Sequence, residues 1–66
     1  MEKRYIILSA TILRDDIRKC LSDLVSARVN RDHIQEEGAL FKMESLMVSA
    51  THQLSYFIDY LKEEEK

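Results

Sequence analysis

The stretch Val29-Asn30-Arg31-Asp32 lies between two long helical patterns and decides the fold. Asparagine tolerates the left-handed backbone conformation that ends many helices, so Asn30 is expected to end the first helix. Asp32 is expected to cap the second helix, and Gln35, three residues later, is placed to complete a capping box. Because the connection is so short, the two helices are predicted to fold back on one another as an antiparallel hairpin.

Apolar residues recur on each side of this turn at alternating steps of four and three, which is typical of a helix that packs along one seam. In the first half these residues are Ile6, Ala10, Leu13, Ile17, Cys20, Leu24 and Ala27. In the second half they are Leu40, Met43, Met47, Ala50, Leu54, Phe57 and Leu61. We therefore predict an all-α fold, a single hairpin domain over residues 1–66, with helices at about 3–29 and 32–63 and a turn at about 30–32.

The start of the second helix and its register leave some choice. Gly38 lowers helix stability by about 1 kcal/mol relative to alanine, so the second helix could instead begin near this residue. A turn centred on Asn30 pairs Cys20 with Leu40 and sets Ala10 opposite Ala50. The same register weakens near the turn, where apolar residues of the first helix meet Glu36 and His33.

More apolar side chains are present than a two-helix hairpin can cover, because such a hairpin buries only one stripe on each helix. The predicted register leaves Phe57 and Leu61 with no apolar residue of the first helix opposite them. Phe57 is of special interest because aromatic side chains dominate the binding energy of many interfaces. The candidate partner-binding residues are Phe41, Val48, Tyr56, Phe57, Ile58, Tyr60 and Leu61. We expect this surface to complete a helical bundle, either by homodimerisation or by packing on a different protein; a compact monomer with bent helices is the third possibility.

The length and composition also point to a partner. A chain of 66 residues holds one core at most, and chains this short often need disulfides, a metal or another chain for stability. One cysteine excludes an internal disulfide, and two histidines with one cysteine do not make an ordinary four-ligand zinc site. One glycine and no proline are too few for the turns of a β-rich domain.

Charge is distributed unevenly along the chain. Residues 1–29 carry a net charge of +2 and residues 30–66 a net charge of −4. The overall acidic balance argues against non-specific nucleic-acid binding, which needs a strongly basic surface. Arg14 and Arg18, one helical turn apart, form the one compact basic feature. The alternative function is therefore a homodimeric four-helix-bundle regulator that contacts nucleic acid, or an acidic partner, through these two arginines.

The sequence favours a non-enzymatic protein with no cofactor. Cys20 falls within the predicted seam, which is the ordinary place of a small buried residue. His52, Ser55 and Asp59 share a helix face, but a solvated face lacks the water exclusion and oxyanion donors that catalysis requires. The longest uncharged runs have nine and fourteen residues, too few for a membrane span. A lone thiol without an export signal favours the cytoplasm.

The stretch Leu13-Arg14-Asp15-Asp16-Ile17-Arg18-Lys19-Cys20-Leu21 and the apolar helix from Leu40 to Leu61 are similar to the small co-chaperone subunits of type III secretion needle complexes. Those subunits are helical hairpins of similar size that pair with a second chaperone to hold an aggregation-prone needle subunit. The resemblance implies a chaperone-like role and carries over no functional residue. Small phage- or plasmid-encoded regulators of host proteins share the same gross features. We predict a protein-binding module: a chaperone, adaptor or regulator.

Overall fold

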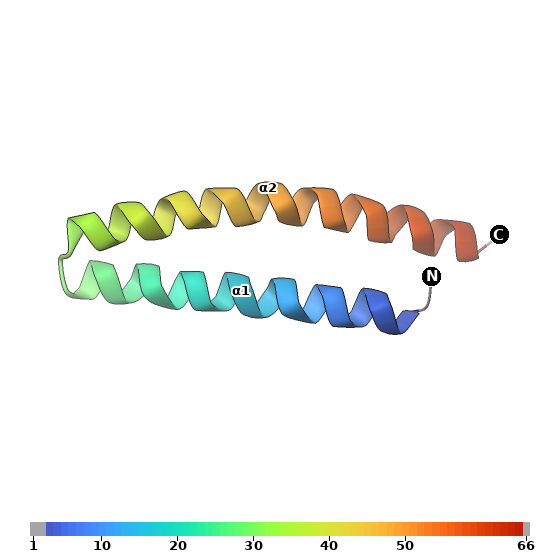
Figure 1. The fold of residues 1–66 in the computed structure, drawn as a ribbon, viewed down its shortest axis with the longest axis horizontal. Helices are drawn as coiled ribbons and strands as arrows, with labels where there is room; N and C mark the ends of the chain where they lie inside the picture. Colours follow the sequence, from blue (N-terminus) through green and yellow to red (C-terminus); the bar gives the residue numbers. More distant parts are fainter. Residues whose placement is uncertain (1–2, 66) are drawn as a thin grey trace.

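The structure, a computed structural model, describes residues 3–65 and consists of two long helices (Figure 1). Helix α1 spans Lys3–Val29 and helix α2 spans His33–Glu64. The helices lie side by side and antiparallel, with the connecting turn at one end, so the predicted all-α hairpin is confirmed. Residues 1, 2 and 66 of the predicted domain lie outside the described residues. The principal extents are 51 × 17 × 12 Å, which makes the hairpin a long, flat rod.

The turn closes α1 in a way that differs from the prediction at one residue. Arg31, not Asn30, adopts the left-handed conformation, with φ of 54°. The amide of Asp32 donates to the carbonyl of Ala27 at 2.9 Å, and the amide of Arg31 donates to that of Arg28 at 3.2 Å. These two bonds form a Schellman motif, in which the left-handed residue comes directly after the helix cap. The cap is therefore Asn30, one residue before the strained position.

Asp32 starts α2 as predicted. Its side-chain Oδ1 accepts a hydrogen bond from the amide of Gln35 at 3.1 Å, and its backbone is extended, with φ of −92° and ψ of 94°. The amide of Glu36 donates to the carbonyl of Asp32 at 2.9 Å, which closes the first helical turn. The helix thus begins at His33, and the alternative start near Gly38 is wrong.

The predicted seam of α1 is confirmed along its whole length. Ile6, Leu13, Cys20, Leu24 and Ala27 are buried, and the remaining two seam residues, Ala10 and Ile17, are half-buried. The expected weakening near the turn is wrong, because Leu24 and Ala27 are both well covered there.

The predicted seam of α2 is only partly right. Met43 and Ala50 are half-buried and Phe57 is buried, as expected. The intervening positions differ, because the helix turns its other flank toward α1. The residues found there are Ala39, Leu46, Gln53 and Tyr60. The residues expected there remain between 42% and 61% exposed and are Leu40, Met47, Leu54 and Leu61.

The short connection accounts for this choice of flank. Three residues held by the Schellman motif and the Asp32 cap leave α2 little freedom to rotate about its own axis. The resulting orientation brings Ala39 against α1, where its small side chain lets the Cys20 thiol donate to the Ala39 carbonyl at 3.3 Å. Leu40, the residue predicted to pair with Cys20, is the next residue along and stays 43% exposed.

Replacing Arg31 with glycine is expected to stabilise the hairpin by about 0.5–1 kcal/mol, because glycine adopts a positive φ without the steric cost that a side chain incurs. Asn30→Gly is the control, since Asn30 has no positive φ and gains nothing from glycine. Urea unfolding followed by circular dichroism at equal chain concentration measures the change in unfolding free energy of both variants. Equal effects at the two positions would contradict the assignment of the strain to Arg31.

Replacing Gly38 with alanine is expected to stabilise α2 by about 0.5–1 kcal/mol, because Gly38 lies in the helix interior and alanine restricts the unfolded chain. A Cβ atom built at Gly38 meets nothing within 4 Å, so no clash offsets this gain. Thermal unfolding by circular dichroism gives the change. A lower melting temperature would mean that another chain approaches the backbone closely at this point.

Candidate interaction surface

The hairpin presents two broad faces, one on each side of the line along which the helices touch. One of them is hollowed into a groove of about 560 Å³ that runs between α1 and α2, and we call it the groove face. The residues lining the groove are Tyr5, Ser9, Ile12, Leu13, Asp16, Leu46, Ser49, His52, Gln53, Tyr56 and Phe57.

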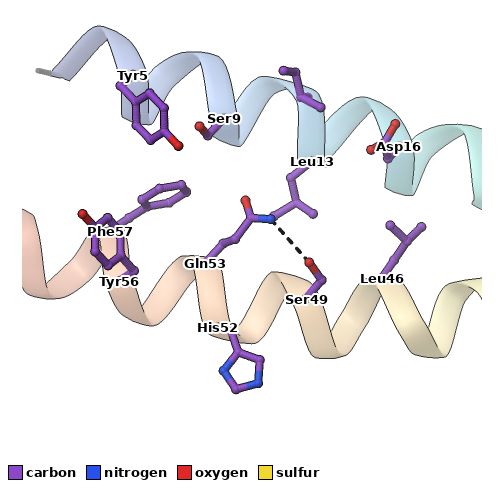
Figure 2. Close-up of a pocket in the computed structure, with 11 residues that line it drawn as sticks. Tyr5, Ser9, Leu13, Asp16, Leu46, Ser49, His52, Gln53, Tyr56 and Phe57 are labelled. Atoms are coloured by element: carbon purple, nitrogen blue, oxygen red, sulfur yellow. Dashed lines mark hydrogen bonds between the residues drawn. The ribbon is translucent and has the colours of Figure 1, made fainter. Parts of the chain in front are cut away.

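Phe57 forms the floor of this groove. Figure 2 shows its ring pointing toward α1, near Tyr5 and Ser9. The side chain is only 6% exposed, and its ring meets that of Tyr56 edge-on at a centroid distance of 6.2 Å. The expectation that Phe57 lacks a mate opposite Lys3 is therefore wrong, because α1 covers it from the Tyr5 turn onward. Phe57 is part of the core of the hairpin.

The polar side chains of the groove include Ser49, His52 and Gln53 of α2. The Gln53 amide Nε2 donates to Ser49 Oγ at 3.4 Å within the same helix, and Figure 2 shows His52 pointing away from α1. The hydrogen bonds of the described residues do not link His52 with Ser55 or Asp59, and all three side chains are exposed. Among residues 3–65, no three His, Cys, Asp or Glu side chains gather closely enough to hold a metal ion.

The opposite face is built from side chains spaced seven residues apart. On α2 it carries the row that the hairpin turns away from α1, consisting of Leu40, Met47, Leu54 and Leu61. On α1 the corresponding row, which lies across the seam from the groove residues Ser9 and Asp16, consists of Ile7, Arg14, Leu21 and Arg28. Residues seven apart lie on one stripe of a helix that follows a coiled-coil seam. We call the surface formed by Ile7, Leu21, Leu40, Met47, Leu54 and Leu61 the apolar face.

The two flanks of α2 differ in how apolar their residues are. The row turned inward contains an alanine, a glutamine and a tyrosine alongside Leu46. The row turned outward is apolar at every position, with three leucines and Met47. The hairpin therefore buries the less apolar flank of its second helix and leaves the more apolar flank in water.

The predicted partner-binding residues lie on several sides of α2. Leu61 belongs to the apolar face and Ile58 lies at its edge. Phe41 and Val48 point outward, away from α1, around a shallow hollow that Glu44 also lines. The other three face the groove or the core: Tyr56 lines the groove, Phe57 is buried and Tyr60 is half-buried.

Most of the apolar face is absent from the predicted list. The signal that could have found it is the unbroken spacing of seven through Leu40, Met47, Leu54 and Leu61. The prediction assigned this row to the interior of the hairpin, because either flank of the row Met43, Ala50 and Phe57 can form a seam.

The basic feature at Arg14 and Arg18 is partly neutralised. The Arg14 guanidinium bonds the Asp15 carboxylate at 3.2 Å, and both side chains are 57% exposed. An ion pair this exposed contributes little to stability, but it reduces the positive charge that a phosphate would meet. Cys20 is 3% exposed, which agrees with a packing role for its side chain.

Comparisons with known proteins do not assign the chain to a family: no protein-family model, no curated protein and no solved structure matches it. The resemblance to the type III secretion co-chaperones therefore stays a prediction. Within residues 3–65, neither helix has a stretch long and apolar enough to span a bilayer.

Replacing Phe57 with alanine is expected to destabilise the hairpin by about 3 kcal/mol, because a buried ring is lost and a cavity is left between the helices. Tyr56→Ala is the control; its side chain is about half-exposed, and its loss should amount to about 1 kcal/mol or less. Urea unfolding of both variants at one chain concentration makes the comparison. Equal losses would contradict the placement of Phe57 in the core.

Proposed function

We propose that the protein is a small, non-enzymatic binding module, a chaperone, adaptor or regulator, that acts by burying its apolar face against another polypeptide chain. The observation that carries the proposal is that α2 presents its more apolar flank to solvent. Leu40, Met47 and Leu54 stand outward while Gln53 is turned inward. A folded chain whose second helix is arranged this way gains considerable free energy when a partner covers the exposed row.

The total exposed area supports the proposal. The chain exposes 5621 Å². A folded monomer of its mass, 7.8 kDa, typically exposes about 4,400 Å². The excess of roughly 1,200 Å² is larger than the roughly 800 Å² that each partner buries in an interface of standard size. Covering one broad face would bring the exposed surface close to that of an ordinary folded protein.

The polar groups beside the apolar face are compatible with burial. Thr11 Oγ1 donates to the carbonyl of Ile7 at 2.7 Å, and Thr51 Oγ1 donates to that of Met47 at 2.9 Å. Each hydroxyl is thus satisfied within its own helix, so a partner can cover it without leaving an unpaired donor. No described side chain that is buried holds a nitrogen or oxygen atom without a hydrogen-bond partner.

The spacing of the row also indicates which kind of surface fits it. Apolar side chains at every seventh position of a helix suit a partner that is itself helical, since knobs from one helix enter the holes of the next. Met47 adds a flexible, polarizable side chain that adapts to irregular partners. The proposed mode is helix-on-helix packing along the length of α2.

A photo-reactive phenylalanine analogue placed at Met47 tests the proposal in living cells. Val48 is the control position, because it is the next residue, is exposed to nearly the same extent (58% against 61%) and points outward from the hairpin. We expect the probe at Met47 to form a covalent adduct with a polypeptide chain, this protein or another, and the probe at Val48 to form much less. Equal cross-linking at the two positions would contradict the proposal.

A further inference from the structure

We propose that the chain covering the apolar face is a second copy of this protein, in a symmetric four-helix bundle whose two turns lie at the same end. This inference rests on the proposed function and names its partner. Three observations carry it: the size of the face, the matched heights of two pairs of its apolar residues, and the placement of charge along its edges.

The size of the face matches a stable dimer. The hairpin is 51 Å long and 17 Å wide, so each broad face covers an area on the order of 850 Å². Interfaces of standard size bury about 800 Å² on each partner. A second hairpin laid face to face therefore covers the whole surface.

Two pairs of apolar residues of the face lie at matching heights on the two helices. Because the Cys20 thiol meets the Ala39 carbonyl, antiparallel residues whose numbers add to about 60 lie at one height. Leu21 is thus level with Leu40, and Ile7 is level with Leu54. A copy related by a two-fold axis parallel to the helices places α1 over the partner's α2 at the same height. Each of these two levels then contributes four apolar side chains to the new core.

The same axis brings opposite charges together. Arg18 lies on the edge of the apolar face that α1 forms, and Glu44 lies on the edge that α2 forms, at nearly the same height. When α1 stands over the α2 of the second copy, Arg18 meets the partner subunit's Glu44, and symmetry repeats the pair. Arg14, whose carboxylate partner Asp15 belongs to its own helix, lies level with Met47 and lays its aliphatic stem on the partner subunit's α2.

The other face-to-face arrangement is disfavoured by charge. An axis perpendicular to the helices would place the turns at opposite ends and stack α1 on the partner's α1. Since the midpoint of α1 lies near residue 16, Arg14 would then stand at the height of the partner subunit's Arg18. Like charges at the middle of an interface oppose assembly, so the arrangement with both turns at one end is the one we propose.

The molar mass of the purified chain, measured by light scattering and sedimentation over a concentration series, is the first test. A mass near twice 7.8 kDa is expected. Leu54→Glu should raise the dissociation constant about 100-fold or more, because the dimer would bury two carboxylates at a level where it otherwise holds only Ile7 and Leu54 side chains. Ser55→Glu, at the next position and exposed in the hairpin, should leave it unchanged. A wild-type monomer, or equal effects of the two variants, would overturn the proposal.

The arrangement of the turns is tested by the distance between labels in the dimer. A spin label on the cysteine of Arg31→Cys, in a Cys20→Ser background, marks each turn; serine retains a donor for the Ala39 carbonyl. Turns at the same end place the two labels roughly 20 Å apart, given the spacing of packed helices. Turns at opposite ends separate them by about the 51 Å length of the rod. The longer distance would overturn the proposed arrangement.

Charge reversal tests the predicted pair. Arg18→Glu and Glu44→Arg are each expected to raise the dimer dissociation constant about tenfold, since each places two like-charged pairs in the dimer. The double variant should recover most of the wild-type affinity. If it is as weak as the single variants, the residues do not face one another and the proposal is overturned.

Failure of this inference is distinguishable from failure of the proposed function. The adduct formed by the probe at Met47 is identified by mass spectrometry. An adduct with the chain itself supports the dimer. An adduct with a different protein, together with a monomeric purified chain, overturns the dimer and leaves the binding function standing. Cross-linking no stronger than at Val48 overturns both.

Discussion

The three-residue connection between the helices is the constraint on which the rest of the structure depends. Asn30, Arg31 and Asp32 are held from both sides, by the two bonds that close α1 and by the cap that opens α2. A longer loop would allow α2 to rotate until its most apolar flank met α1. The three-residue connection allows very little rotation. The rotation of α2 about its own axis is therefore set at the turn, and it fixes which flank faces α1 along all 32 residues of the helix.

The consequence of that phase is visible at every turn of α2. The contact line passes through Ala39, Leu46 and Gln53, and the leucines next to Ala39 and Gln53 stand outward. Close approach of the helices compensates in part for the leucine side chains that are not buried. Ala39 lets the helices come near enough for the Cys20 thiol to reach a backbone carbonyl. The hairpin is thus held by small residues near the turn and by Phe57 near the other end, with a half-buried glutamine between them.

Sequence periodicity was sufficient to predict the hairpin, the seam of α1 and the capping role of Asp32, because each depends on local spacing or on a single side chain. It was not sufficient to choose the flank of α2. Met43, Ala50 and Phe57 are shared by two possible seams, and the one with Leu40, Met47 and Leu54 is the more hydrophobic. Hydrophobicity alone favours that seam, whereas the phase depends on which of two adjacent residues, Asn30 or Arg31, takes the left-handed conformation. The error at the candidate site has a different origin: one-to-one pairing along the seam set Phe57 opposite Lys3, whereas the Phe57 side chain is covered by α1 near Tyr5.

The disagreement between hydrophobicity and observed burial is itself informative about function. Natural sequences generally satisfy local preference, patterning and packing together, and conflicts between these levels concentrate at functional surfaces. In this chain the conflict covers one complete flank of a helix, not a single residue. Gln53 is half-buried while its apolar neighbour Leu54 is exposed. One heptad earlier Leu46 is half-buried and Met47 is exposed, but there both residues are apolar. The row maintained over four heptad positions stays between 42% and 61% exposed in the hairpin, and its regular spacing suits the second helical layer that we propose. In the dimer that we propose, the hairpin is half of a larger core.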